Sequence, residues 1–103
     1  MDKIEKLRTF LISTPDDSFL KHALALEYIK TGDDNRARTL FMEILTHDPS
    51  YIGTYYHLGR LMERAGESEN AKSWFARGMA AAIRVDDKHS YNELKAALEE
   101  LTD

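Results

Sequence analysis

Four histidines are the side chains in this sequence with the broadest chemical use, because imidazole binds metal ions and exchanges protons near neutral pH. They are His22, His47, His57 and His89. None belongs to an HExxH or HxxxH pattern, which would place two ligands on one helix face. His22 and His57 could approach one another on neighbouring helices, but the candidate third ligand Glu63 would lie off the face of His57. We therefore expect neither a metal site nor a metal cofactor.

The sequence also lacks the pattern of a catalytic nucleophile. The chain has no cysteine, which excludes a thiol nucleophile, a disulfide framework, an iron–sulfur cluster and a Cys-based zinc site. It contains no GxSxG motif, no serine with a recognisable His–Asp spacing, and no GxxxxGK or GxGxxG loop. Paired carboxylates at 16–17, 33–34 and 86–87 stand at expected helix starts, where negative charge stabilises the helix dipole. We therefore expect no catalytic residue, no cofactor and no enzymatic activity; a metal-dependent enzyme would have to purify with stoichiometric metal.

The composition predicts one compact domain. The chain has 103 residues, of which 43% are apolar and 31% charged, a mixture typical of globular proteins and too apolar for a disordered tail. Its net charge of −4 argues against a general nucleic-acid or anionic-membrane binder. Apolar runs among the first thirty residues, such as Phe10-Leu11-Ile12, are far too short for a signal peptide or membrane span. We expect a cytoplasmic protein.

The elements that would position any site follow from an internal repeat of 34 residues. Shifted by this offset, the chain places identical residues on one another: Pro15 on Pro49, Leu24 on Leu58, Gly32 on Gly66, Ala37 on Ala71 and Phe41 on Phe75. Apolar residues within each unit recur at three- and four-residue spacing, and no alternating strand pattern occurs. The chain is therefore predicted to be all-α, with two helices in each repeat.

Capping residues predict where these helices begin and end. Gly32 and Gly66 supply the left-handed residue that ends the first helix of each unit. Thr14-Pro15 and Asp48-Pro49 each read as a cap followed by proline at the first helical position. The second helices are expected to have Asp34 and Ser68 as N-caps. All six boundaries point to helix–turn–helix units.

The two ends of the chain complete this organisation. Residues 1–17 carry an apolar stripe of their own and correspond to the second helix of a truncated preceding unit. Ile83 replaces a third proline, so the last repeat helix is expected to run on towards Val85. A final amphipathic helix is predicted to open with the capping-box pattern Ser90-Tyr91-Asn92-Glu93. Six helices are expected in all.

The spacing of these residues resembles the tetratricopeptide repeat (TPR) family. The matching positions are Leu24, Ala25, Tyr28, Ala37, Phe41 and Pro49 in residues 18–51, and Tyr55, Leu58, Gly59, Met62, Ala71, Phe75 and Gly78 in residues 52–85. Lys21 departs from the pattern where a large residue is usual, and Ile83 where a proline is usual. The resemblance implies a TPR-type helix–turn–helix solenoid within residues 1–103. Its parts would be a half-repeat helix at 1–17, repeats at 18–51 and 52–85, and a capping helix at 86–103.

TPR proteins bind extended peptides in the concave groove lined by the first helix of each repeat, and the resemblance implies the same here. The chain would then be a protein–protein interaction adaptor or scaffold for another protein or peptide. The side chains expected to line the groove are Phe19, His22, Leu26, Ile29, Tyr56, Arg60 and Arg64. Arginine and tyrosine are over-represented at binding hot spots, and a guanidinium at this place could hold a ligand carboxylate.

Alternatives for these side chains stay open. The apolar ones can instead pack against neighbouring helices. Arg60 and Arg64 can be ordinary solvated charges or pair with the acidic C-terminal helix, where residues 86–103 carry six acidic and two basic side chains. The alternative function is a self-associating structural module, a homodimer or larger homo-oligomer, formed through the same apolar strip or through Trp74.

One TPR subgroup clamps the C-terminal carboxylate of chaperone tails with lysines and asparagines. His22 and Leu26 stand here where that clamp has Lys and Asn on its first repeat. We therefore predict that the chain is not a receptor for chaperone tails.

Overall fold

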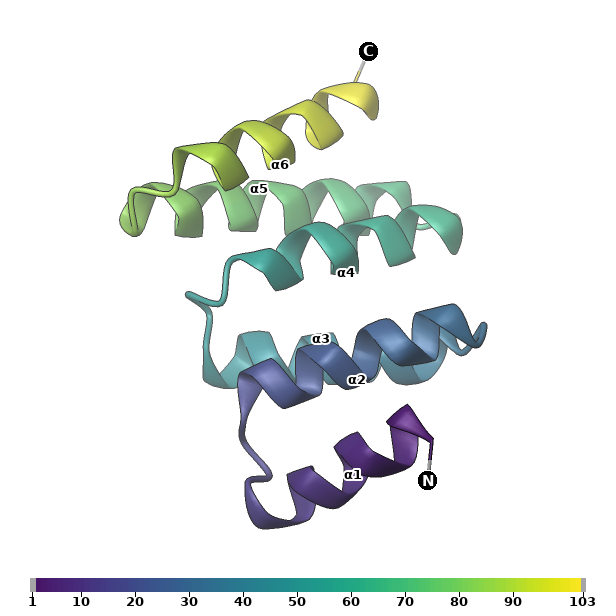
Figure 1. Ribbon diagram of the computed structural model, residues 1–103. Coiled ribbons are helices and arrows are strands. Elements are labelled where there is room, and N and C mark those ends of the chain that lie inside the picture. Colours follow the sequence, from purple (N-terminus) through teal and green to yellow (C-terminus); the bar gives the residue numbers. More distant parts are fainter. Residues whose placement is uncertain (1, 103) are drawn as a thin grey trace. The chain divides into compact units, whose positions relative to one another are not determined.

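Six α-helices and no β-strand make up residues 2–102, the part of the chain that the computed structural model describes (Figure 1). The helices are α1 (Lys3–Ser13), α2 (Ser18–Lys30), α3 (Asp34–His47), α4 (Gly53–Arg64), α5 (Ser68–Arg84) and α6 (Lys88–Glu100). The predicted all-α class and helix number are confirmed, and α5 does run on to Val85, its C-cap. Within residues 2–102, no helix combines the length and the apolar character needed to cross a bilayer.

The helices gather into two compact units, α1–α3 up to Asp48 and α4–α6 from Pro49 onward. Each unit is described by itself. The single-domain organisation, with boundaries after residues 17, 51 and 85, stays a prediction.

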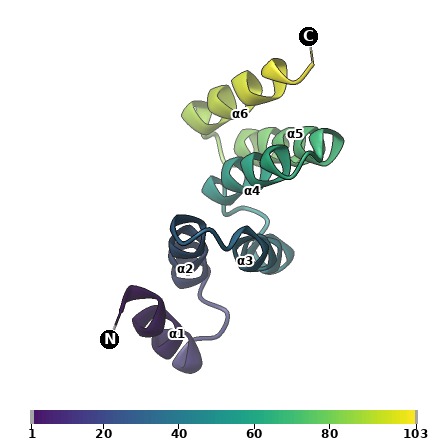
Figure 2. The same cartoon turned by 90° about the vertical axis from the view of Figure 1, so that its right-hand side faces the viewer.

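In the first unit, α2 and α3 lie side by side and are joined by a short turn (Figure 2). Small residues allow the two helices to approach, because Ala25 of α2 and Ala37 of α3 are completely buried. The ring of Phe41 is completely buried with them. α1 packs on α2, although none of its own residues is fully buried. This packing explains why the repeat alternates alanine with large apolar residues.

Lys21 occupies the position where the TPR pattern has a large residue. Its side chain is buried, and its Nζ lies 3.3 Å from Oε1 of Glu43 on α3. The aliphatic stem fills the space that a large apolar residue would fill, while the ion pair offsets the cost of burying the ammonium group. The departure from the pattern is therefore compatible with the same packing.

In the second unit, α5 packs against both α4 and α6. Glycines mark the close contacts. The ring of Phe75 occupies the space that a side chain at Gly59 would need. A Cβ at Gly78 would lie 2.6 Å from Cβ of Tyr55 and 2.8 Å from Cδ1 of Leu94, so only glycine allows this close contact. These two glycines set the spacing of α5 from its neighbours.

The prediction that Pro15 and Pro49 occupy first helical positions is wrong. Thr14 is the C-cap of α1, and its N–H donates to the Phe10 carbonyl at 3.3 Å. Asp48 is likewise the C-cap of α3, and its N–H donates to the Ile44 carbonyl at 2.7 Å. A residue before proline avoids the α conformation, so each proline ends the preceding helix, and the next begins three or four residues later.

The predicted N-caps are displaced by one to three residues. Asp33, not Asp34, caps α3, because its Oδ1 accepts the Arg36 N–H at 3.1 Å. α5 begins at Ser68 itself, with Glu67 at the N-cap. α6 begins at Lys88, capped by Asp87, so the expected capping box at residues 90–93 is wrong. More than one of the adjacent polar residues could cap each helix, and the geometry of the turn determines which one does so.

Those turns share one geometry. Each places a residue in the left-handed region: Gly32 at φ 83°, Gly66 at φ 78° and Asp86 at φ 56°. The next residue then donates its N–H to the carbonyl five positions back, as in the Schellman motif: Asp33 to Tyr28, Glu67 to Met62 and Asp87 to Ala82. The α5–α6 connection therefore has the turn found between the two helices of a repeat, with aspartate in place of glycine.

Candidate peptide-binding surfaces

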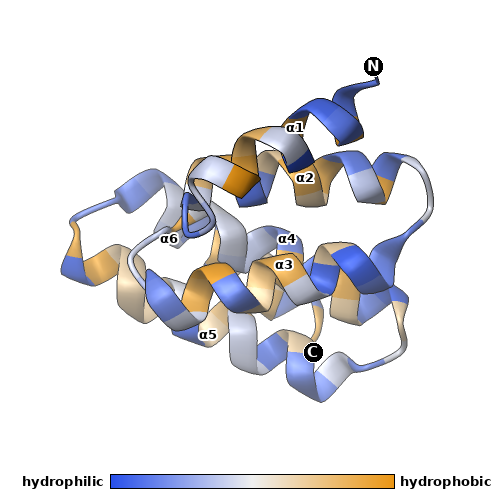
Figure 3. Cartoon of the chain, turned by 90° about the horizontal axis from the view of Figure 1, so that it is seen from below, coloured by the Kyte–Doolittle hydropathy of each residue, from blue (hydrophilic) through white to orange (hydrophobic). Residues whose placement is uncertain are grey.

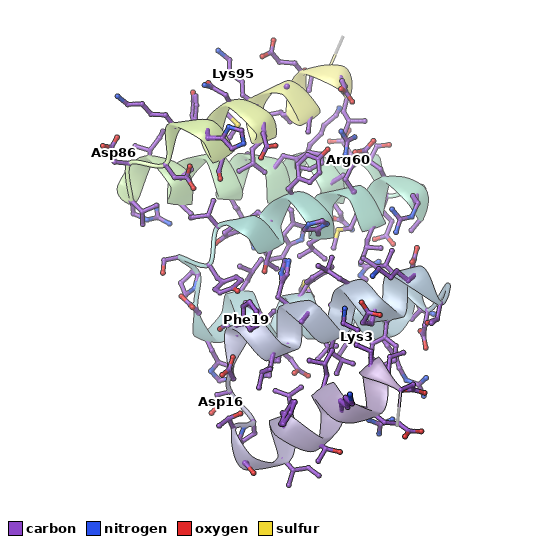
Figure 4. The ribbon with its side chains drawn as sticks, viewed as in Figure 1. Lys3, Asp16, Phe19, Arg60, Asp86 and Lys95 are labelled. Atoms are coloured by element: carbon purple, nitrogen blue, oxygen red, sulfur yellow. The ribbon has the colours of Figure 1, made fainter. Side chains whose placement is uncertain are left out.

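The first predicted surface runs along α2. Asp17 begins this helix, with Oδ1 accepting the Leu20 N–H at 3.0 Å, and so places Phe19 in the first turn (Figure 4). Phe19 is 69% exposed, an unusually high fraction for a large apolar side chain. Leu26 and Ile29 are half-buried. The apolar strip is therefore exposed at its N-terminal end and partly covered further along the helix, and its role in binding stays a prediction.

His22 lies between these residues and is also half-buried. Its ring centre is 5.4 Å from that of Phe41, with the two rings tilted by 48°. The imidazole thus packs against a core side chain of the first unit. Phe19 remains the most open side chain of the strip.

The second predicted surface contains Tyr56 and Arg60, which the structure brings together. Nε of Arg60 donates to the Tyr56 hydroxyl at 3.0 Å, and the guanidinium carbon lies 5.0 Å from the ring centre. Nη1 donates to Glu63 at 2.7 Å and to Glu100 of α6 at 3.4 Å. These hydrogen bonds, first with Tyr56 and then with Glu63, raise the pKa of Arg60. The alternative of pairing with the acidic C-terminal helix is therefore observed for Arg60.

Arg64 is the last residue of α4 and is exposed. It lies in the unit that holds Tyr56 and Arg60, whereas the strip from Phe19 to Ile29 lies in the other unit. A single groove lined by all seven residues stays a prediction.

A hollow of about 330 Å³, the α4–α6 hollow, lies beside Tyr56 in the second unit. Residues of α4, the residue before it and α6 line it: Ile52, Gly53, Tyr56, His57, Ser90, Glu93 and Leu94. No atom comes within 4 Å of the place where a Cβ at Gly53 would stand, so glycine leaves this end of the hollow open. Its size is that of a small ligand site or a side-chain pocket.

Burial determines the charge of His57 in this hollow. Removal of the imidazole from water lowers its pKa, while the carboxylate of Glu93 acts in the opposite direction with less effect. Burial therefore favours the neutral imidazole. Glu93 beside it is 56% exposed.

Ser90 and Glu93 were not predicted to line this hollow, because the sequence at residues 90–93 has the pattern of a capping box. Ser90 instead donates its hydroxyl to Asp87 at 2.8 Å, inside the first turn of α6. One signal was present. A shift of 36 residues places Tyr55, Leu58 and Met62 on Tyr91, Leu94 and Leu98, and so places His57 on Glu93. α6 thus follows the pattern of the first helix of a repeat.

A second hollow, of about 340 Å³, lies in the first unit away from every predicted site residue. It is lined by Arg8, Leu24, Tyr28, Asn35, Arg36, Thr39 and Leu40. The Arg36 guanidinium lies 5.8 Å from the centre of the Tyr28 ring and pairs with Asp33 at 2.9 Å. Its lining combines apolar side chains with the two arginines Arg8 and Arg36.

Trp74, the other side chain considered for self-association, is half-buried on α5. Its ring centre lies 6.1 Å from that of Tyr55, and the Arg77 guanidinium covers it at 4.6 Å. Among residues 2–102, no three His, Asp or Glu side chains are grouped so that they could hold a metal ion.

Solved structures with this arrangement of helices identify the family. The crystal structure of a tetratricopeptide repeat domain protein from Salinibacter ruber is 37% identical, covers 84% of this chain and 96% of its own, and superposes with a TM-score of 0.80. A solution structure of a tetratricopeptide repeat domain protein from the same organism is 38% identical over 84% of this chain and 88% of its own, with a TM-score of 0.81. The chain belongs to the tetratricopeptide repeat family.

Further relatives agree with this TPR assignment. A TPR repeat-containing protein of Pseudomonas aeruginosa is 29% identical over 98 residues, which is 95% of this chain and 93% of its own. The solution structure of a Bordetella parapertussis protein shares the fold with a TM-score of 0.84 over 99% of this chain and 89% of its own, at 24% identity. No model of a known protein family matches the chain. TPR proteins generally mediate protein–protein interaction and are typically not enzymes.

Proposed function

We propose that this TPR protein is an interaction adaptor that binds a segment of another protein on the groove faces of α2 and α4. The residues that would contact the segment are Phe19, His22, Leu26, Ile29, Tyr56, Arg60 and Arg64. Proteins with one scaffold fold bind many unrelated partners. The side chains of the binding site, and not the fold, determine which partner is bound.

The exposure of Phe19 is the observation that carries this proposal. At 69% exposure, the ring leaves most of its apolar area in water, on the helix that TPR proteins use for binding. Covering a phenylalanine completely is worth roughly 2 kcal/mol, so a partner that covers this ring gains a substantial part of its affinity there. Tyr56 adds an aromatic wall to the hollow on α4.

Affinity capture from the lysate of the source organism tests the proposal with a matched pair of variants. Phe19→Asp removes the apolar ring from the groove face, whereas Ile83→Asp changes a 65% exposed apolar residue on α5. Both variants must first show wild-type helicity and melting temperature. The proposal expects a partner that Ile83→Asp retains and Phe19→Asp loses; the reverse pattern would place the binding surface elsewhere.

Self-association is the second candidate, and one observation favours it. Four large apolar side chains of the first unit are exposed: Phe10 by 59%, Ile12 by 80%, Phe19 by 69% and Met42 by 38%. The last part of α1 is strongly hydrophobic in Figure 3. Sedimentation velocity at micromolar concentration distinguishes the two functions, because the adaptor is expected to be a monomer of 11.8 kDa and the structural module a dimer or larger.

A further inference from the structure

The charges around Arg60 reverse the preference expected for the groove of the second unit. Arg60 was a candidate to hold a ligand carboxylate, yet its guanidinium already donates to Tyr56, Glu63 and Glu100. Its positive charge faces two carboxylates of the chain itself. A ligand carboxylate would have to displace one of them, so Arg60 offers an anion little additional stabilisation.

The neighbouring α4–α6 hollow has the opposite character. Glu93 is the acidic side chain among the described residues that line it, and burial favours the neutral form of His57. Ser90 adds a hydroxyl, while Ile52, Tyr56 and Leu94 supply apolar and aromatic walls. A carboxylate at the edge of a partly apolar hollow suits a cation on an aliphatic stem.

Glu93 has one other ionic contact, which leaves it able to accept a ligand. His89 lies one turn earlier on α6, with Nε2 at 3.6 Å from Oε2 of Glu93, and contributes a charge only when protonated. The His89 side chain is 84% exposed, so a ligand can displace it at little cost. Gly53 also lines the hollow and adds no side chain to it.

We propose that the α4–α6 hollow binds a lysine or arginine side chain of the partner segment, with Glu93 as the counter-charge and Tyr56 and Leu94 against the aliphatic stem. This inference rests on the proposed function and adds the chemistry of the residue that is recognised. The partner segment is therefore basic at this position.

Amide NMR spectra of the whole chain test this inference with three acetylated amino-acid amides as probes. Arginine amide carries the cation, citrulline amide is its neutral isostere, and glutamate amide carries the opposite charge. The arginine probe is expected to shift the signals of Gly53, His57, Ser90 and Glu93 saturably, and to bind about tenfold more tightly than the citrulline probe, as for one charge-assisted hydrogen bond.

Two variants with the same change of charge provide the control. Glu93→Gln is expected to abolish the difference between arginine and citrulline, whereas Glu99→Gln is expected to preserve it. Glu99 is exposed on α6 and does not line the hollow; Lys95, one turn earlier, points away from α5 (Figure 4). Equal binding of the arginine and citrulline probes to the wild type, or tighter binding of glutamate amide at these residues, overturns the inference.

Failure of the cation site can be distinguished from failure of the proposed function. If a partner is captured through Phe19 while the arginine probe shows no preference at the hollow, the cation site is wrong and the adaptor function stands. If the arginine probe binds as expected while Phe19→Asp retains every partner, the cation site stands and the groove proposal fails.

Discussion

The ring of Phe75 on α5 lies directly over Cα of Gly59 on α4, so that a Cβ at Gly59 would stand only 2.7 Å from ring atoms Cδ1 and Cζ. Phe75 itself is completely buried. In the first unit, Ala25 and Phe41 occupy the corresponding places 34 residues earlier, and both are completely buried. In the second unit, the Phe75 ring therefore lies closer to the backbone of α4 than a methyl group at position 59 would allow.

Gly59→Ala is therefore expected to lower the free energy of unfolding. Alanine is favoured over glycine by about 1 kcal/mol in a helix, but the overpacking against the Phe75 ring costs roughly 1–3 kcal/mol. Chemical denaturation measures the balance. Gly53→Ala is the control, since nothing lies within 4 Å of its Cβ position, and this variant should be neutral or slightly more stable. A stabilised Gly59→Ala protein would contradict the packing described for α4 and α5.

Asp86→Gly is expected to stabilise the chain by about 0.5–1 kcal/mol, because aspartate here occupies a left-handed conformation that glycine adopts without strain. The relevant φ is 56°, close to the values of Gly32 and Gly66 in the corresponding turns. Thermal unfolding would show the gain as a higher melting temperature. Asp86→Ala should instead be destabilising, and Asp86→Asn separates the effect of charge from that of conformation.

The pH dependence of stability should carry the signature of His57. Its pKa is lowered by burial in the folded chain, so between that value and the ordinary value of about 6.5 the unfolded state binds a proton that the folded state does not. The resulting stabilisation is complete above about pH 6.5 and is lost as the pH falls below it.

His57→Gln should therefore flatten the decline in unfolding free energy between about pH 7.5 and about pH 5.5, the range around the ordinary pKa of an imidazole. His47→Gln, at an exposed position on α3, is the matched control and should retain the wild-type decline. An unchanged decline in His57→Gln would show that the imidazole is not desolvated in the folded chain.

A peptide ending in Glu-Glu-Val-Asp is expected not to bind at micromolar concentration. His22 and Leu26 replace the lysine and asparagine of the chaperone-tail clamp, and Arg60 is already paired with Glu63 and Glu100. Fluorescence anisotropy with a labelled peptide makes the measurement, with the charge-reversed peptide Lys-Lys-Val-Lys amide alongside. Micromolar affinity for the acidic peptide would contradict the prediction that the chain is not a receptor for chaperone tails. It would also contradict the proposed preference of the α4–α6 hollow for a cation.

The packing residues could be predicted because their type alone encodes their role. Alanine or glycine at positions 25, 37, 59 and 71 and phenylalanine at 41 and 75 recur at one spacing, and all six are buried. The helix boundaries were harder to predict from the sequence. Asp33 and Asp34 can both cap a helix, and the choice depends on the 2.8 Å hydrogen bond from the Asp33 N–H back to Tyr28, which only the folded turn reveals.

The site was harder to predict because it depends on pairings between distant residues. Arg60 and Glu100 are 40 positions apart, and their hydrogen bond follows from how α6 lies beside α4. The hollow beside His57 likewise requires Ser90 and Glu93 of α6. Ser90 was the predicted N-cap, but the helix begins two residues earlier, at Lys88, so both residues lie inside it. Sequence spacing indicates which face a residue shares on its own helix, not which charge it meets on another.

Site-specific photo-crosslinking in cells tests the central claim, that the groove faces of α2 and α4 hold a partner segment. Benzoylphenylalanine would replace Phe19, Tyr56 or, as the control on α5, Ile83. An adduct with the same partner is expected from positions 19 and 56, and none from position 83. An adduct from position 83 alone, or an adduct from position 19 with the mass of two copies of the 11.8 kDa chain, would contradict it.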